Sequence, residues 1–137
     1  MNEEAQMNEI NAAAPAGDVY DWYTRGMRLL TSGDAAAAAA LLEHAARAEP
    51  ASCSVREALA RALFDSGRYA DARAAFAANV DDSPADDYAH FGLGLSHVRM
   101  GELDEAVEHL AIAVALRPEN HHYGTALRSA RAARARG

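Results

Sequence analysis

Residues 59–84, LARALFDSGRYADARAAFAANVDDSP, decide the fold, because they join two helix-forming stretches through one glycine and end on one proline. Three marks of this stretch recur along the chain at a spacing of 34 residues. A glycine suits the left-handed cap at the end of a helix, and a proline cannot continue a helix. The chain is therefore predicted to be a series of helix–turn–helix units. The marks are Gly33, Gly67 and Gly101, then Ala38, Ala72 and Ala106, then Pro50, Pro84 and Pro118.

The marks place six helices in three pairs. We expect them over about residues 18–32 and 34–48, then 53–66 and 68–82, then 86–100 and 102–116.

The two ends of the chain depart from the repeat. A seventh helix over about 119–135 combines an apolar stripe (Tyr123, Leu127 and Ala130) with a polar back, as the end piece of a stacked array requires. Residues 1–17 are interpreted as a flexible tail. The prediction is one domain over residues 18–136, with repeats of about 19–52, 53–86 and 87–120.

The composition supports an all-α chain and narrows the class of function. Alanine, the strongest helix former, supplies 35 of the 137 residues. The net charge is −7, whereas nucleic-acid-binding domains usually carry a basic face. There is no apolar run of the ~20 residues that span a membrane, no signal-peptide pattern and only one cysteine, Cys53, so a cytoplasmic location is expected. Arginine without any lysine, beside abundant alanine, is typical of high-GC bacterial genomes such as those of actinobacteria.

The repeated unit resembles the tetratricopeptide repeat. That pattern runs Trp, two residues, Leu-Gly, two residues, Tyr, then Ala, three residues, Phe, then Pro. The matching residues are Trp22, Gly26, Leu29, Ala38, Leu42, Ala45 and Pro50 in the first unit, Leu59, Ala60, Leu63, Ala72, Phe76 and Pro84 in the second, and Leu93, Gly94, Ala106, Leu110, Ala113 and Pro118 in the third. The resemblance implies an all-α solenoid of three repeats with a capping helix.

The physical role of these residues follows from their size. Small residues at Gly26, Ala60 and Gly94 allow the two helices of one hairpin to approach closely, and Leu42, Phe76 and Leu110 are expected to fill the seams between units. The chain departs from the family pattern at Arg56 and His90, which replace the aromatic residue, and at Asn79, which replaces a late alanine. We expect these departures to loosen the seams between units.

A second stripe on the first helix of each unit is offset from the packing residues. In the first and third units its apolar residues are spaced three, four and three apart, and the second unit places a charged strip between them. Because first helices of such hairpins line a concave groove, this stripe is the predicted binding surface for an extended peptide or an amphipathic helix of another protein. The predicted groove residues are Tyr20, Tyr23, Met27, Glu57, Arg61, Phe64, Tyr88, Phe91, Leu95 and Arg99. The stripe ends at Leu30 in the first unit and at Val98 in the third. For Leu30, Phe64 and Val98 the alternative is that they complete the core instead of facing the groove.

Other chemistry finds little support. His90 and His97 are seven residues apart on one helix, about 10 Å, which is too far to share one metal ion. There is no glycine-rich phosphate loop and no nucleophile–base pattern, so no cofactor, no metal and no catalytic residue is predicted. Relatives that clamp a chaperone's C-terminal carboxylate carry basic and Asn residues where this chain has Tyr23, Met27, Ala58, Tyr88 and Gly92. The prediction is a non-catalytic adaptor.

Two alternatives stay open. A short array has exposed ends, so the chain could instead be a self-assembling subunit, a homodimer being the simplest case. The arginines of the last helix (Arg128, Arg131, Arg134 and Arg136) could contact RNA or an acidic protein. They could also form only a solubilising outer face that suits a helix C-terminus.

Overall fold

The computed structural model describes residues 15–137, which form seven helices and no strand. The helices are α2 (Val19–Thr31), α3 (Ala35–Ala48), α4 (Cys53–Asp65), α5 (Tyr69–Asp82), α6 (Asp87–Arg99), α7 (Leu103–Leu116) and α8 (His121–Arg136). The predicted helices are confirmed with small shifts at their ends. The predicted flexible tail falls mainly on residues 1–14, which lie outside the described residues.

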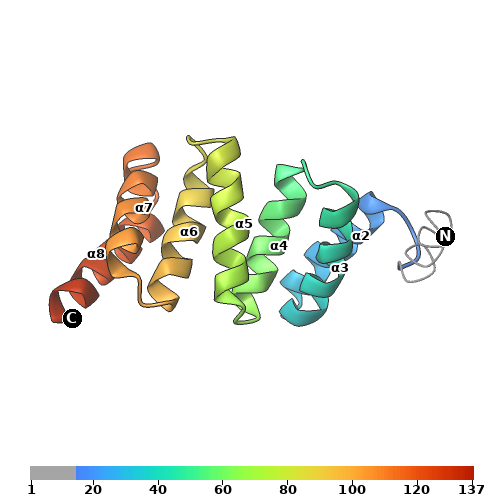
Figure 1. Ribbon diagram of the computed structural model, residues 1–137, viewed down its shortest axis with the longest axis horizontal. Coiled ribbons are helices and arrows are strands. Elements are labelled where there is room, and N and C mark those ends of the chain that lie inside the picture. The colour runs from blue at the N-terminus through green and yellow to red at the C-terminus, as the bar shows by residue number, and fades with distance from the viewer. Residues whose placement is uncertain (1–14) are drawn as a thin grey trace, which may run out of the picture.

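The helices follow one another in chain order along the long axis of the molecule (Figure 1). Each packs against its neighbours in sequence, and α2, α4, α6 and α8 also contact one another in succession. Among the described helices, α3, α5 and α7 do not contact one another. The layer whose helices touch is the inner layer of a curved array, so α2, α4, α6 and α8 line the concave side.

The turns inside the hairpins have the expected chemistry. Gly33, Gly67 and Gly101 adopt φ values of +87°, +86° and +76°, in the left-handed region that favours glycine. At the start of α4 and α6, the side chains of Ser52 and Asp86 accept hydrogen bonds from the backbone N–H groups of the first turn. These caps fix where each helix begins.

The close approach is confirmed in the first and third hairpins, but the leucines expected between units meet the glycine of their own hairpin. A Cβ placed on Gly26 would lie 2.6 Å from Cγ of Leu42, and one on Gly94 would lie 2.7 Å from Cγ of Leu110. Both leucines are fully buried. Glycine therefore sets the distance between the paired helices, and the leucine fills the space that it leaves.

Three different side chains make one recurring contact. Nε1 of Trp22 donates to the Ala16 carbonyl at 3.2 Å, Nη2 of Arg56 donates to the Pro50 carbonyl at 2.6 Å, and Nε2 of His90 lies 2.8 Å from the Pro84 carbonyl. In each case the acceptor is six residues earlier, in the segment that leads into the first helix. The position requires a donor of sufficient reach rather than an aromatic residue.

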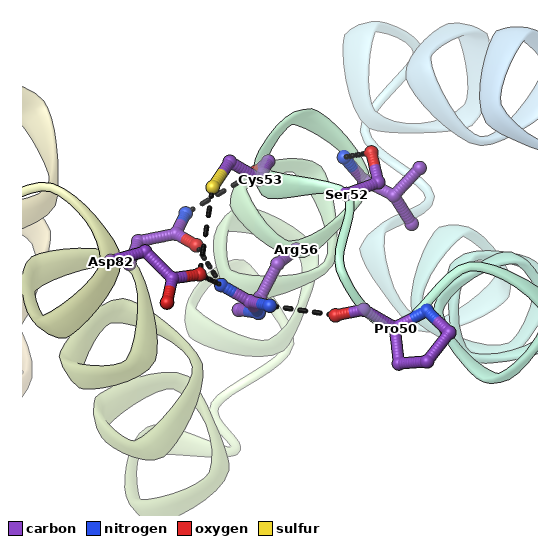
Figure 2. A network of polar contacts seen from close by, with 7 residues as sticks. Pro50, Ser52, Cys53, Arg56 and Asp82 are labelled. Carbon is purple, nitrogen blue, oxygen red and sulfur yellow. Dashed lines mark hydrogen bonds and ion pairs between the residues drawn. The ribbon is translucent and has the colours of Figure 1, made fainter.

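Arg56 and Asn79 meet inside the second hairpin, between α4 and α5, so their contact does not test the expected loosening between units. Nη1 of Arg56 lies 2.7 Å from both Oδ1 of Asn79 and Oδ2 of Asp82, and Nδ2 of Asn79 donates to the Cys53 carbonyl at 3.3 Å. Figure 2 shows Arg56 between Asp82 and Pro50. The hydrogen bond from Arg56 is the main reason that the pKa of Asp82 is lowered. Within residues 15–137 no buried side-chain nitrogen or oxygen lacks a partner.

Adding one methyl group at Gly94 tests the close approach. We expect Gly94→Ala to lower the free energy of unfolding by about 1–3 kcal/mol, because the new Cβ forces Leu110 out of its place. Gly124 of α8 is the matched control, since a Cβ there would meet only Nη1 of Arg128 at 3.5 Å. Gly124→Ala should stabilise the protein by up to about 1 kcal/mol, as alanine does in a helix interior. Urea unfolding followed by circular dichroism measures both; equal effects of the two variants would contradict the packing argument.

A double-mutant cycle tests the hydrogen bond between Arg56 of α4 and Asn79 of α5. Arg56→Ala leaves Oδ1 of Asn79, a residue that is 1% exposed, without its donor, so it should cost about 1–3 kcal/mol. Removing both partners in Arg56→Ala/Asn79→Ala should cost less than the sum of the single changes by at least about 0.5 kcal/mol. Strict additivity in chemical denaturation would show that the two side chains do not act together.

Candidate peptide-binding groove

The concave side holds a cavity of about 240 Å³ between α4 and α6. Five predicted groove residues line it together, namely Arg61, Phe64, Tyr88, Phe91 and Leu95. Three further lining residues, Asp65, Phe76 and Gly92, were not predicted for the groove.

The floor of the cavity depends on Phe76 and Gly92. Phe76 comes from α5 and is 2% exposed, and a Cβ on Gly92 would lie 2.4 Å from Cε1 of its ring. The Phe76 ring also meets Tyr88 edge-on, with 6.1 Å between the ring centroids. A ring of the outer layer thus reaches the inner surface because position 92 has no side chain. The sequence signal for this contact is a large residue at position 76 together with glycine at position 92. The sequence pattern assigned Phe76 only to the packing between units.

Two arginines stand at the basic end of the groove. The guanidinium carbon of Arg99 lies 5.7 Å from the centroid of Phe64 and 5.6 Å from that of Tyr69, within the distance of a cation–π contact to both rings. Neither Arg99 nor Arg61 forms an ion pair with any carboxylate of residues 15–137. A guanidinium in a cation–π contact keeps N–H groups free for a carboxylate. The N–H groups of both arginines are therefore available to a ligand.

Glu57 stands at the acidic end, near the N-termini of α4 and α6. Its pKa is raised, first by partial burial and then by the charge of Asp86, while Arg61 opposes the shift. A carboxylate in this position gains from a cation brought by a ligand. The groove therefore carries Glu57 toward the N-terminal ends of α4 and α6, the aromatic rings of the cavity next, and Arg61, Arg99 and the carboxylate Asp65 toward their C-terminal ends.

Helix α8 covers part of the predicted stripe. Phe91 packs on Tyr123 of α8 with 4.7 Å between the ring centroids, and the Tyr123 hydroxyl donates to Oδ2 of Asp87 at 2.6 Å. Burial, followed by this hydrogen bond, raises the pKa of Tyr123. Leu95 and Val98 also pack against the core that α7 and α8 share. Helix α8 thus closes the groove at the C-terminal end of the array.

The remaining predicted residues lie elsewhere on the first helices. Tyr20, which is 74% exposed, and Tyr23 line a separate hollow of about 220 Å³ with Ser54 and Val55. Met27 lines another hollow on α2. Leu30 is buried in the core, whereas Phe64 is half-buried and shares the core and the cavity.

Other kinds of site have little support in residues 15–137. No group of three His, Cys, Asp or Glu side chains there could hold a metal ion. None of the helices described has the length and apolar character needed to cross a bilayer. Of the α8 arginines, Arg134 lies 3.8 Å from Asp104 and Arg128 contacts Thr125, and the four are exposed.

The curved array and its inner groove define the class of helical-repeat scaffolds, which are typically non-catalytic and mediate contacts between proteins. A tetratricopeptide repeat model matches residues 23–87, 57–121 and 91–137. The chain belongs to the tetratricopeptide repeat family. No curated protein matches the sequence.

Solved structures share the fold. A chain of MamA (residues 41 to the end) from Desulfovibrio magneticus RS-1 is 25% identical with a TM-score of 0.81, and the match covers 85% of this chain and 66% of that one. The first tetratricopeptide domain of Spaghetti (RPAP3), bound to the HSP90 peptide SRMEEVD, is 19% identical with a TM-score of 0.80, covering 89% of this chain and 97% of that one. This chain therefore spans about two thirds of the MamA chain and nearly all of the RPAP3 domain.

Removing one hydroxyl group tests the attachment of α8. Tyr123→Phe should lower the free energy of unfolding by about 1.5–3 kcal/mol, because it deletes a hydrogen bond to a charged group. Tyr20→Phe is the matched control, since its hydroxyl is exposed, and it should change stability by less than about 0.5 kcal/mol. Thermal and urea unfolding measure both variants. A Tyr123→Phe protein as stable as the control would show that the contact with Asp87 does not hold α8 in place.

Proposed function

We propose that this chain is a non-catalytic adaptor of the bacterial cytoplasm that binds a short segment of another protein along α4 and α6. The observation that carries the proposal is the aromatic-walled cavity on the concave side, with the unpaired Arg61 and Arg99 beside it. Aromatic residues and arginine are enriched among the residues that dominate binding energy at protein interfaces. A side chain that enters the cavity leaves water and packs against Phe64, Phe76 and Tyr88.

The charges indicate how the segment would lie. A carboxylate of the ligand would meet Arg61 and Arg99 at the C-terminal ends of α4 and α6, and a basic side chain would meet Glu57 near their N-terminal ends. The apolar anchor would lie between these two groups, over Phe76 and Gly92. Opposite charges at the two ends would select one direction of binding.

The RPAP3 structure supports a peptide ligand only by analogy of fold. Tyr23, Met27, Ala58, Tyr88 and Gly92 occupy the positions that form a carboxylate clamp in relatives that bind chaperone tails. We therefore do not extend the proposal to that ligand. The ligand proposed here has an apolar anchor between charged residues.

Two other functions stay predictions. Self-assembly would use the first helix, where Met27 and Leu29 border a hollow and no described helix precedes α2. Contact with RNA or an acidic protein would use the arginines of α8. Neither would depend on the cavity between α4 and α6, so the experiment below separates them from groove binding.

The binding experiment uses a random-peptide display library panned against the immobilised full chain. We expect enriched peptides to share one apolar residue flanked by charge, and to bind Arg61→Ala at least about fivefold more weakly, a loss of about 1 kcal/mol. Arg128→Ala on α8 removes the same charge away from the cavity and should bind as the wild type does. Peptides without a common anchor, or equal binding by both variants, would contradict the groove. A stable dimer in light scattering, unchanged by Arg61→Ala, would instead favour self-assembly.

A further inference from the structure

Three histidines lie together where α6 packs against α7, and the proposed groove does not use them. His90 and His97 come from α6, and His109 of α7 lies between their rings. The ring centroid of His109 is 5.3 Å from that of His90 and 5.7 Å from that of His97, with interplanar angles of 23° and 11°. The sequence separation of His90 and His97 does not reveal the third ring between them.

The hydrogen bonds fix which nitrogen of each ring carries a proton. Nε2 of His90 faces the Pro84 carbonyl at 2.8 Å, and Nδ1 of His97 faces Oε1 of Glu102 at 2.8 Å. Both partners only accept, so both nitrogens carry hydrogen. Nδ1 of neutral His90 is then bare and accepts the Nδ1–H of His109 at 3.1 Å. The stack is held by one particular set of tautomers.

A proton added to this stack disturbs the hydrogen bond between His90 and His109. His90 can accept a proton only at Nδ1, where the N–H of His109 already points, so protonation of His90 requires His109 to move its own proton from Nδ1 to Nε2. A proton on Nε2 of His109 would place a charge between two other imidazoles. Burial is the main reason that the pKa of His109 is lowered, and His90 and His97 lower it further, while Glu108 opposes the shift.

The carboxylates around the stack have other partners or are exposed, and Glu108 alone among them favours a charge on His109. From α5, Arg73 binds Glu102 at 2.8 Å, so this carboxylate already holds both Arg73 and His97. From α7, Glu108 is exposed and lies next to His109 in sequence. At the start of α6, Asp86 caps the helix, and Asp87 binds Tyr123 of α8 and Arg117. No carboxylate of residues 15–137 hydrogen-bonds to His90 or His109.

We propose that the three stacked histidines are an acid-sensitive latch, which weakens the junction of α6 with α7 below about pH 6 while the first hairpin stays intact. The same helix α6 carries Tyr88, Phe91 and Leu95 of the cavity, so an opened latch would also lower ligand binding. That last consequence rests on the proposed function. The latch itself is tested without any ligand, so the failure of one proposal leaves the other standing.

The direction of the pH effect follows from proton linkage. Because the folded chain holds the pKa of His109 below the ordinary 6.5, the unfolded chain binds more protons below that pH, and stability is lost on acidification. The unfolding equilibrium constant should rise by a factor approaching ten per pH unit for each such imidazole. Glu57, whose pKa is raised, gives a slope of the opposite sign. The pKa values of Asp82 and Glu102 are lowered, so their contributions are lost only in more acidic solution, below the ordinary 3.8 and 4.5.

The first test is an NMR titration of the histidine rings in the full chain, together with amide hydrogen exchange at pH 7 and pH 5. We expect His109 to titrate below 6.5. Protection factors of α6 and α7 should fall at least about fivefold more than those of α2 and α3. A His109 that titrates at or above its ordinary value, or a uniform fall of protection along the array, would overturn the proposal.

A pair of variants separates the latch from general acid sensitivity. His109→Gln keeps an N–H donor for His90 but cannot take up a proton, so its stability should depend less on pH between 7 and 5. Its unfolding equilibrium constant should rise less steeply than that of the wild type, by a factor of up to about ten per pH unit. His122→Gln removes an exposed histidine and should keep the wild-type dependence. Identical pH profiles for wild type and His109→Gln would overturn the latch. If His109→Gln does not fold, the wild-type titration decides alone.

Discussion

The close contact between the two helices of each hairpin is the constraint on which the rest of the structure depends. In the outer hairpins a glycine meets a fully buried leucine, Gly26 with Leu42 and Gly94 with Leu110. No side chain fits between these helices, so their separation is fixed by backbone and leucine alone. The middle hairpin has Ala60 and Phe76 instead, and its larger ring packs against Gly92 of the next hairpin. The same replacement that adapts the packing therefore forms the floor of the cavity.

A second constraint acts at the start of each hairpin. Trp22, Arg56 and His90 occupy one repeated position and each contacts the carbonyl six residues earlier. Each choice alters its surroundings. Arg56 requires acceptors and finds them in Asn79 and Asp82, whereas His90 requires a donor and finds His109. These three positions are thus equivalent in geometry but different in chemistry, and the third pairs the two histidines on which the proposed latch depends.

The sequence predicts the repeat, the helices and the small-to-large contacts, because each follows from residues at a fixed spacing. It also places Arg61, Phe64, Tyr88, Phe91 and Leu95 on one face, and the structure brings these five to one cavity. It does not predict that Tyr20 and Tyr23 line a separate hollow, because their separation depends on the curvature of the array. The pairing of Arg56 with Asn79 could have been predicted, because both residues depart from the family pattern within the same unit. The position of His109 could not, because its ring meets His90 and His97 only through the packing of two helices.

The most direct measurement of the central claim is the chemical environment of Gly92 in the NMR spectrum of the full chain. If the Phe76 ring lies against this glycine and forms the floor of the cavity, the Gly92 Hα resonances should be shifted upfield and show strong NOEs to the Phe76 ring protons. Gly124, where a Cβ would meet Nη1 of Arg128 and no part of Phe76, should show no NOE to the Phe76 ring. Random-coil shifts for Gly92 without NOEs to Phe76 would contradict both the packing of the middle hairpin and the cavity that depends on it.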